Sequence, residues 1–387
     1  MTVRESSRGP KARDDRARLL RPLRGLARIV VPGVVPALTT FLAACGPPPA
    51  PPPEENLAFA SDTLTAAWGN FPAAAALSGG RWAVVSSDFD AAVIADFNKK
   101  SLAPLGGARQ KAYIHPAAVF TFSDTIYLSD WGKRRATVWT IDGRLVDSIP
   151  APDPLRGSLP KARDGAGQLY FEVAPPAKRD GSGNRDSAAV VRAPRATTRF
   201  DTLVRLAPLD LKEMRPGQAS QRFERMIFSG IDLWGVWPDG GVWVARLLHN
   251  QVDIRDPSGK IIHGPELPDP VYEVTQADRN RFLQSFPADV RPKETELPWA
   301  LIHPPFVAAF MSPDGIWLEK SKPALDSVRR IQVLDRQGNL KRLLRLKGDG
   351  RLIAVGGDQI LVAEQFEHGV RLMQVRIPAP PPPPAKP

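Results

Sequence analysis

Short apolar segments recur along the chain, and each one follows a turn residue. Six of them are rich in β-branched or aromatic residues, and they begin at Arg81, Thr125, Gln168, Gly241, Gly315 and Gln359. Runs of this length and composition are typical of β-strands. Their starts lie 44, 43, 73, 74 and 44 residues apart. Three of these intervals match the period of about 40–45 residues of a four-stranded propeller blade, and each longer interval equals one period plus about 30 residues.

Hairpin signals follow several of these segments. The clearest stretch runs from 136 to 146, with similar stretches at 252–262 and 331–340. Each places Asp and Gly between two apolar runs, which is typical of a β-hairpin. We find no long helical period outside the N-terminal leader and one insert. The pattern therefore predicts an all-β fold, a six-bladed β-propeller of four-stranded antiparallel blades.

The repeats resemble those of six-bladed propellers of the NHL/TolB-like kind, whose blades carry a YV-x-D…RI-x-V-x-D-x-x-G pattern. Residues 127–130 with 138–143 match it best, and residues 331–338 match its second half. The resemblance covers about 57–377. It implies an architecture and no particular activity, because propellers carry many functions.

The expected blades span about 72–107, 112–152, 158–209, 228–268, 304–347 and 350–377. The last unit is one strand short, so we expect residues 60–67 to supply its outer strand and close the ring. Trp243 and Trp317 occupy the same offset in their repeats as Tyr127 and Tyr170. We therefore expect these four side chains to fill space between blades.

The N-terminus has the features of an export signal. An Arg-rich stretch is followed by a short apolar run, 29–44, which is interrupted by two prolines. The run ends in Leu-Ala-Ala-Cys-Gly, which resembles the lipobox of bacterial lipoproteins, and Cys45 is the only cysteine of the chain. We expect a signal peptide at 1–44, a Pro-rich tether at 45–56 and a disordered Pro-rich tail at 378–387. A plain membrane anchor or an ordinary cleaved signal remains the alternative.

This resemblance implies an exported protein, lipid-anchored through Cys45 in the cell envelope, at the outer membrane or periplasmic face of a Gram-negative cell. The formal net charge is +11, but residues 1–44 hold nine Lys or Arg and three Asp or Glu, a net of +6. The rest carries only +5, which argues against nucleic acid as a partner. We expect a monomer whose partners are the membrane and an envelope protein or extracellular ligand.

Three inserts are expected on one face of the disc. Loops of an antiparallel blade with strands A to D alternate between two ends, so B–C and D–A loops share a face. Residues 174–188 lie in a B–C loop, whereas 208–227 and 266–304 join D to A strands. Elaborated loops on one side of a scaffold commonly carry binding. Thr275 and Asp278 form a capping-box-like pair, which predicts a short helix at about 275–285.

Polar and aromatic residues are expected on the same face. The candidate ligand- or partner-binding residues are Asp130, Trp131, Glu172, Trp234, Arg246, His249, Asn250, Trp299, His303, Glu319 and Glu364. Gluconolactonase-like propellers hold a divalent ion near the axis, and Glu172, Asn250 and Asp130 are the nearest analogues here. That resemblance implies a Ca²⁺ in the pore, but we favour the interpretation that these are charged strand ends that face water or pair with a neighbouring Arg, and no cofactor is expected.

The interpretation is a docking or sensing module that binds through this face. The chain lacks an HExxH pair and a G-x-S-x-G elbow, which argues against a zinc hydrolase and an α/β-hydrolase appendage. A metal-dependent lactonase or a quinone-dependent sugar dehydrogenase of six-bladed propeller type is the alternative, and a structural envelope component is a third interpretation.

The lipobox resemblance makes a direct prediction. Cells fed radiolabelled palmitate should label the wild-type chain and should not label Cys45→Ala, because the motif implies that the Cys45 thiol carries the labelled diacylglycerol. Thr40→Ala, in the same leader, should keep the label. Equal labelling of wild type and Cys45→Ala would refute lipidation at this cysteine.

Overall fold

The computed structural model describes residues 51–58, 62–106, 113–194, 199–214, 222–313 and 315–379. The predicted signal peptide, Cys45 and all but two residues of the predicted tail lie outside these ranges. The chain from Ala50 onward forms one compact unit. No helix within the described ranges is long and apolar enough to cross a membrane.

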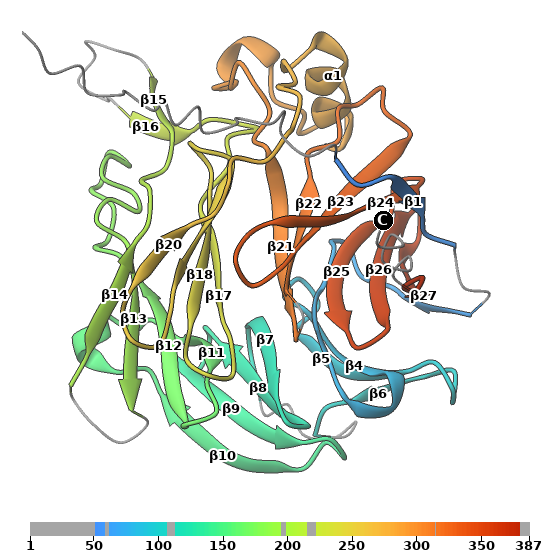
Figure 1. The fold of residues 1–387 in the computed structure, drawn as a ribbon. Helices are drawn as coiled ribbons and strands as arrows, with labels where there is room; N and C mark the ends of the chain where they lie inside the picture. Colours follow the sequence, from blue (N-terminus) through green and yellow to red (C-terminus); the bar gives the residue numbers. More distant parts are fainter. Residues whose placement is uncertain are drawn as a thin grey trace, which may run out of the picture. The chain divides into compact units, whose positions relative to one another are not determined.

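Six four-stranded antiparallel sheets form the blades of a β-propeller, as predicted (Figure 1). Blades one to three consist of β3 (Ala73–Ala76), β4 (Arg81–Ser86), β5 (Ala91–Asp96) and β6 (Ser101–Pro104); β7 (Pro116–Phe122), β8 (Thr125–Asp130), β9 (Arg135–Thr140) and β10 (Leu145–Pro150); and β11 (Pro160–Arg163), β12 (Gln168–Val173), β13 (Ala189–Pro194) and β14 (Asp201–Arg205). Blades four to six consist of β17 (Leu233–Val236), β18 (Val242–Arg246), β19 (Gln251–Arg255) and β20 (Ile261–His263); β21 (Phe306–Ser312), β22 (Gly315–Lys320), β23 (Val328–Leu334) and β24 (Leu340–Lys347); and β25 (Arg351–Gly356), β26 (Gln359–Phe366) and β27 (Gly369–Arg376).

The last blade is closed by β2 (Thr63–Ala66), which confirms the predicted exchange of an N-terminal strand. β2 runs antiparallel to β27, with Leu64 opposite Leu372. A further strand was not expected. β1 (Glu54–Asn56), which lies within the predicted tether, pairs parallel with β24 and adds a fifth strand to blade five. Both ends of the propeller are thus tied to its last two blades.

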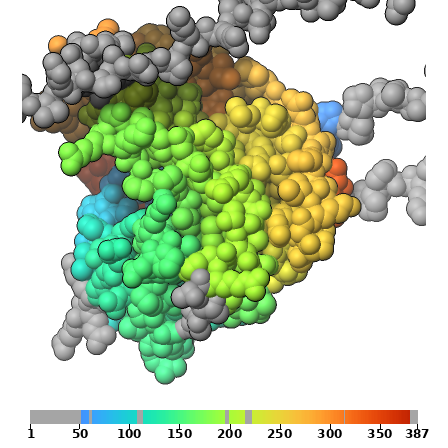
Figure 2. Space-filling view, turned by 90° about the vertical axis from the view of Figure 1, so that its left-hand side faces the viewer, coloured from blue at the N-terminus to red at the C-terminus, as the bar shows by residue number. Residues whose placement is uncertain are grey.

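Each of the six buried apolar clusters lies between two neighbouring blades. Trp82 of blade one, for example, packs with Ile353 and Leu361 of blade six. The four aromatic residues expected between blades, Tyr127, Tyr170, Trp243 and Trp317, are all buried in such clusters. Figure 2 shows one flank of the ring, where the green surface of blade three meets the yellow surface of blade four. The core is therefore a closed circle of interfaces.

The two D–A inserts have secondary structure of their own. The first contains a hairpin, β15 (Leu211–Met214) with β16 (Arg222–Arg225), and the second contains α1 (Gln276–Gln284) and a 3₁₀ turn, η3 (Glu294–Glu296). The predicted helix is confirmed, with Thr275 as N-cap and Asp278 completing the capping box. The hairpin and α1 both lie at the top of the view in Figure 1. Two other short 3₁₀ turns, η1 (Ser78–Gly80) and η2 (Asp153–Leu155), lie between strands.

The pairing of β2 with β27 should contribute measurably to the free energy of unfolding. Leu64→Ala should lower the free energy of unfolding by about 2–5 kcal/mol, because a buried side chain is removed from the interface between the last blade and the first. Thr65→Ala, on the exposed face of the same strand, should change it by less than about 0.5 kcal/mol. Denaturant unfolding measures both; equal stability of Leu64→Ala and wild type would contradict the closure.

Candidate functional site: a loop-rich face and an axial channel

Exposed apolar side chains gather on one face of the propeller, which we call the loop-rich face because it bears the B–C and D–A segments. The described residues include 13 exposed large hydrophobic side chains, and nine of them lie in those segments. They are Phe89, Ile114, Trp131, Leu248, Val271, Val290, Leu301, Ile302 and Leu325. Val307 lies at the same end of β21, and only Leu145, Val146 and Ile261 lie on outer strands. Exposed apolar groups mark an interaction surface where they form a contiguous patch.

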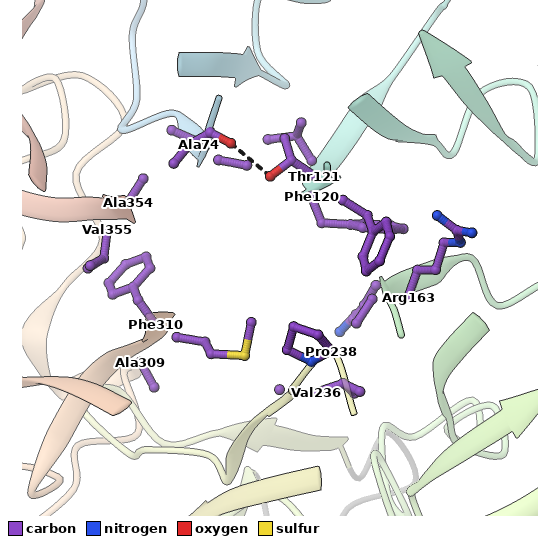
Figure 3. A pocket seen from close by; sticks show the side chains of 18 of the residues that line it. Ala74, Phe120, Thr121, Arg163, Val236, Pro238, Ala309, Phe310, Ala354 and Val355 are labelled. Carbon is purple, nitrogen blue, oxygen red and sulfur yellow. Dashed lines mark hydrogen bonds between the residues drawn. The ribbon is translucent and has the colours of Figure 1, made fainter. Parts of the chain in front are cut away.

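An axial channel of about 490 Å³ runs between the innermost strands of all six blades, β3, β7, β11, β17, β21 and β25. Its wall is mostly apolar, with Phe120, Phe310 and Val355 among the labelled side chains in Figure 3. The charged lining residues are Lys161 and Arg163, both from β11. A polar contact, Thr121 Oγ1 donating to the carbonyl of Ala76 at 2.8 Å, joins two inner strands.

A second pocket of about 300 Å³ opens where the inner strands of blades five, six and one begin, at the loop-rich face. It shares Ala74 and Phe310 with the channel, so the two spaces adjoin at these residues. We call it the channel mouth. In four blades a β-bulge interrupts the inner strand close to its first residue, including between Phe306 and Ala308 and between Leu352 and Ala354. Bulges redirect side chains at sheet ends, and here they place Val307 and Ile353 in the mouth.

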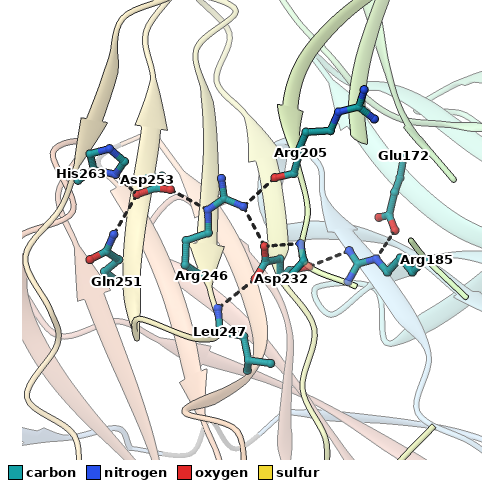
Figure 4. A network of polar contacts seen from close by, with 10 residues as sticks. Glu172, Arg185, Arg205, Asp232, Arg246, Leu247, Gln251, Asp253 and His263 are labelled. Atoms are coloured by element: carbon teal, nitrogen blue, oxygen red, sulfur yellow. Dashed lines mark hydrogen bonds and ion pairs between the residues drawn. The ribbon is translucent and has the colours of Figure 1, made fainter. Parts of the chain in front are cut away.

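A polar network joins blades three and four on the loop-rich face (Figure 4). Glu172 accepts a hydrogen bond from Arg185 Nε at 2.9 Å, and its other oxygen accepts from Lys161 Nζ and Trp234 Nε1, each at 3.0 Å. Arg185 also donates to the carbonyl of Asp232 at 3.0 Å. The predicted site residues Glu172 and Trp234 are therefore brought into direct contact.

Arg246 continues this network. Its guanidinium donates to Asp232 at 2.9 Å and to Asp253 at 2.7 Å, and His263 Nδ1 lies 2.6 Å from the other Asp253 oxygen. Asp232 also accepts from the backbone of Ala207 and Leu247. Burial alone would lower the pKa of Arg246, but the hydrogen bonds to Asp253 and Asp232 raise it above its usual value. The network holds the D–A segment of blade four against its B strand.

Asn250 belongs to a different cluster, between blades four and five. Its amide donates to Asp269 at 2.8 Å, and Asp269 also receives Lys320 Nζ at 2.5 Å and Gln332 at 2.8 Å. Lys320 is buried, and this burial lowers its pKa although Asp269 opposes the shift.

His303 and Trp299 lie in the insert that carries α1. They pack with Phe228 at ring-centroid distances of 5.0 and 6.0 Å, and Trp299 also meets Phe282 of α1 at 5.5 Å. His303 is buried with Nε2 3.3 Å from Asp278, the capping residue of α1. These residues fix the insert to the face.

The remaining predicted site residues divide into engaged and exposed groups. Asp130 is fully buried and accepts from the backbone of Ile114 and His115. Glu319 is buried with Arg329, and Glu364 pairs with Arg371 at 3.0 Å. Trp131 is 58% exposed and His249 is exposed, both on the loop-rich face.

The residues offered by the sequence as metal ligands do not converge. Asp130, Glu172 and Asn250 each belong to a separate set of contacts, described above, and no group of three His, Cys, Asp or Glu side chains within the described ranges is placed to hold a metal ion. The arrangement therefore does not fit the axial Ca²⁺ that the gluconolactonase resemblance implied.

Sequence reasoning missed several residues of this face. Asp232 and Arg185 lie outside any strand, in segments where no periodicity applied. Arg351 and Arg329, which flank the channel mouth beside Glu319, are strand residues. The first residue of the sixth inner strand is Arg351, and its place at the mouth could have been recognised from the strand order alone.

Among the comparisons with known proteins, only solved structures give matches. No family model matches the chain, and no curated protein does. Among solved structures, virginiamycin B lyase from Staphylococcus aureus aligns with a TM-score of 0.44 and 11% identity over 83% of this chain and 100% of that one. A calcium-binding protein, regucalcin, from Agrobacterium tumefaciens aligns with a TM-score of 0.42 and 9% identity over 84% and 98%. A putative exported protein from Bacteroides fragilis gives 0.43 and 10% over 84% and 94%.

The Glu172 contacts predict a pH dependence of stability. Burial would raise the pKa of this carboxyl group, but Lys161, Trp234 and Arg185 together lower it from 4.5 to about 2. A lowered native pKa gives stability that is complete above the unfolded value and is lost as the pH falls from about 4.5 towards 2.

Wild type and Glu172→Gln should therefore differ most near neutral pH, and the difference in unfolding free energy should shrink by up to about 3 kcal/mol as the pH falls through that window. Denaturant unfolding at several pH values measures it. Glu367→Gln, an exposed side chain, serves as the control at neutral pH. A difference that stays constant down to the acid limit would contradict the assignment.

Proposed function

We propose that the chain is a cell-envelope binding module that engages an envelope protein or an extracellular ligand through its loop-rich face. The observation that carries the proposal is the unequal distribution of exposed apolar side chains, nine of 13 of which lie in B–C and D–A segments. Burying such groups against a partner is favourable in proportion to the apolar area removed from water.

The charged residues of the same face support binding over catalysis. Glu172, Asp232, Asp269 and Arg246 are held in ion pairs and backbone contacts, so they position loops. Among the side chains that face solvent there, Trp131 and Leu248 are apolar, and His249 is the exposed titratable group of the predicted set. Trp and other aromatic residues at such positions are common anchors of binding interfaces.

The anchor through Cys45 is part of the proposal. A lipid on this residue, followed by the prolines at 47–53 as a stiff spacer, would hold the propeller close to a membrane surface. A partner in the envelope would then be met at a high local concentration.

Site-specific photo-crosslinking tests the loop-rich face. A benzophenone amino acid replaces Trp131 in one variant and Leu145 in the other; both positions are exposed, but Leu145 lies on the outer strand β10. In the native envelope, adducts are expected from position 131 and not from position 145. Adducts from position 145 alone would contradict the assignment of the binding face.

A further inference from the structure

The channel mouth combines an apolar wall with one arginine, Arg351, that forms no ion pair with the residues that the structure describes. Its lining consists of apolar residues apart from Glu319 and Arg351; the apolar members include Phe71, Val307, Phe310 and Ile353. Val307 is 46% exposed, so the mouth opens to solvent on the loop-rich face. A space of about 300 Å³, which adjoins one of about 490 Å³, is in the size range of small-molecule pockets.

Glu319 is not available to a ligand. One of its oxygens accepts a hydrogen bond from Arg329 Nη1 at 2.5 Å, and the other accepts the backbone N–H of Leu352 at 2.8 Å. Its side chain is 1% exposed. The negative charge at the base of the mouth is therefore already matched by Arg329.

Arg351 makes no hydrogen bond or ion pair with any residue in the described ranges. Its guanidinium lies over the ring of Phe71, 4.8 Å from the centroid, and the side chain is exposed in the mouth. Partial desolvation of the guanidinium lowers its pKa, and the nearby cations Arg329 and Arg281 lower it further, while the carboxylate of Glu319 opposes the shift. The carboxylate of Asp349 accepts hydrogen bonds from two cations, Arg281 and Lys322. It therefore leaves no excess negative charge to balance Arg351.

The guanidinium of Arg351 favours a ligand that carries a negative charge. A guanidinium without a carboxylate partner, beside other cations and at the rim of an apolar space, gains most from a ligand that brings a single acid group and a water-excluding body. A simple inorganic anion would leave the apolar wall exposed to water, and an uncharged apolar molecule would leave Arg351 unpaired.

We propose that the channel mouth binds an amphipathic carboxylate, with its acid group on Arg351 and its apolar body along Phe71, Phe310 and the axial channel. The inference rests on the proposed function, because the mouth opens on the loop-rich face, and it names the chemistry of the ligand. A fatty acid is the simplest member of this class.

The opposite part of the channel provides a matched control. Arg163 also lacks a hydrogen bond or ion pair to any described residue, and it stacks on Phe122 at 4.5 Å from the ring centroid. It lines the channel but not the mouth. If the acid group sits at the mouth, Arg163 has no role in holding it.

Titration calorimetry of the full chain carrying Cys45→Ala, which removes any acyl group of its own, tests the proposal with dodecanoate and dodecanol as probes. Dodecanoate should bind, and R351M should weaken it by about tenfold or more, as expected for loss of a charge-assisted pair. R163M should leave its affinity unchanged, and R351K should retain part of the preference. Dodecanol should bind the wild type and R351M equally.

Thermal melts of the variants establish that each is folded. The proposal is overturned if dodecanoate does not bind the Cys45→Ala protein. It is also overturned if R351M binds dodecanoate as tightly as that protein does, or if R163M loses as much affinity as R351M. Cross-links from position 131 that persist while dodecanoate fails to bind would overturn the ligand class alone and leave the proposed function standing.

Discussion

Closure of the ring by the β2–β27 pair is the constraint on which the rest of the structure depends. Every blade is apolar on both sides, so each must be covered by two neighbours. The cluster around Trp82 and Leu64 joins the first blade to the last. If that interface opened, one side of each terminal blade would meet water, and β27 would become an unprotected edge. The N-terminal strand β2 covers the edge of β27, although the two strands lie far apart in the sequence.

Closure also decides which groups meet on the loop-rich face. Because all six inner strands begin at the same end, the segments before them converge there. Buried aspartates hold these segments: Asp130 accepts from Ile114 and His115, Asp232 from Ala207 and Leu247, and Asp278 from Ala324. Burying a carboxylate is costly unless it is fully hydrogen-bonded. Each of these carboxylates accepts several hydrogen bonds, so it fixes the position of the loop that donates to it. The apolar side chains of the same loops remain at the surface.

The sequence was most informative where a periodic pattern was present. The repeat, the hairpin turns, the capping box of α1 and the exchange of the N-terminal strand were all predictable, because each depends on local residue types or on counting strands. β1 was missed because three residues after a proline run carry no apolar pattern. Of the three residues suggested as metal ligands, Asp130 and Glu172 lie at B-strand ends and Asn250 lies in the turn before β19, and the three face different neighbours. The partner of a charged side chain depends on the conformation of loop segments such as 174–188. That conformation follows from tertiary contacts and could not be predicted from the local sequence.

The wall of the axial channel combines short side chains with large ones. β3 is four alanines and β21 contains two more, whereas Phe120 and Phe310 are among the larger lining residues. An apolar space of this kind gives affinity to any hydrophobic body but no orientation, because burial is not directional. Orientation requires a fixed charge at one end. Lys161 is neutralised by Glu172 and Arg329 by Glu319, whereas Arg351 at the mouth and Arg163 in the channel form no ion pair with a described residue. Arg351 lies at the mouth that faces the loops, so under the proposal it is the group that would orient an acid entering from that face.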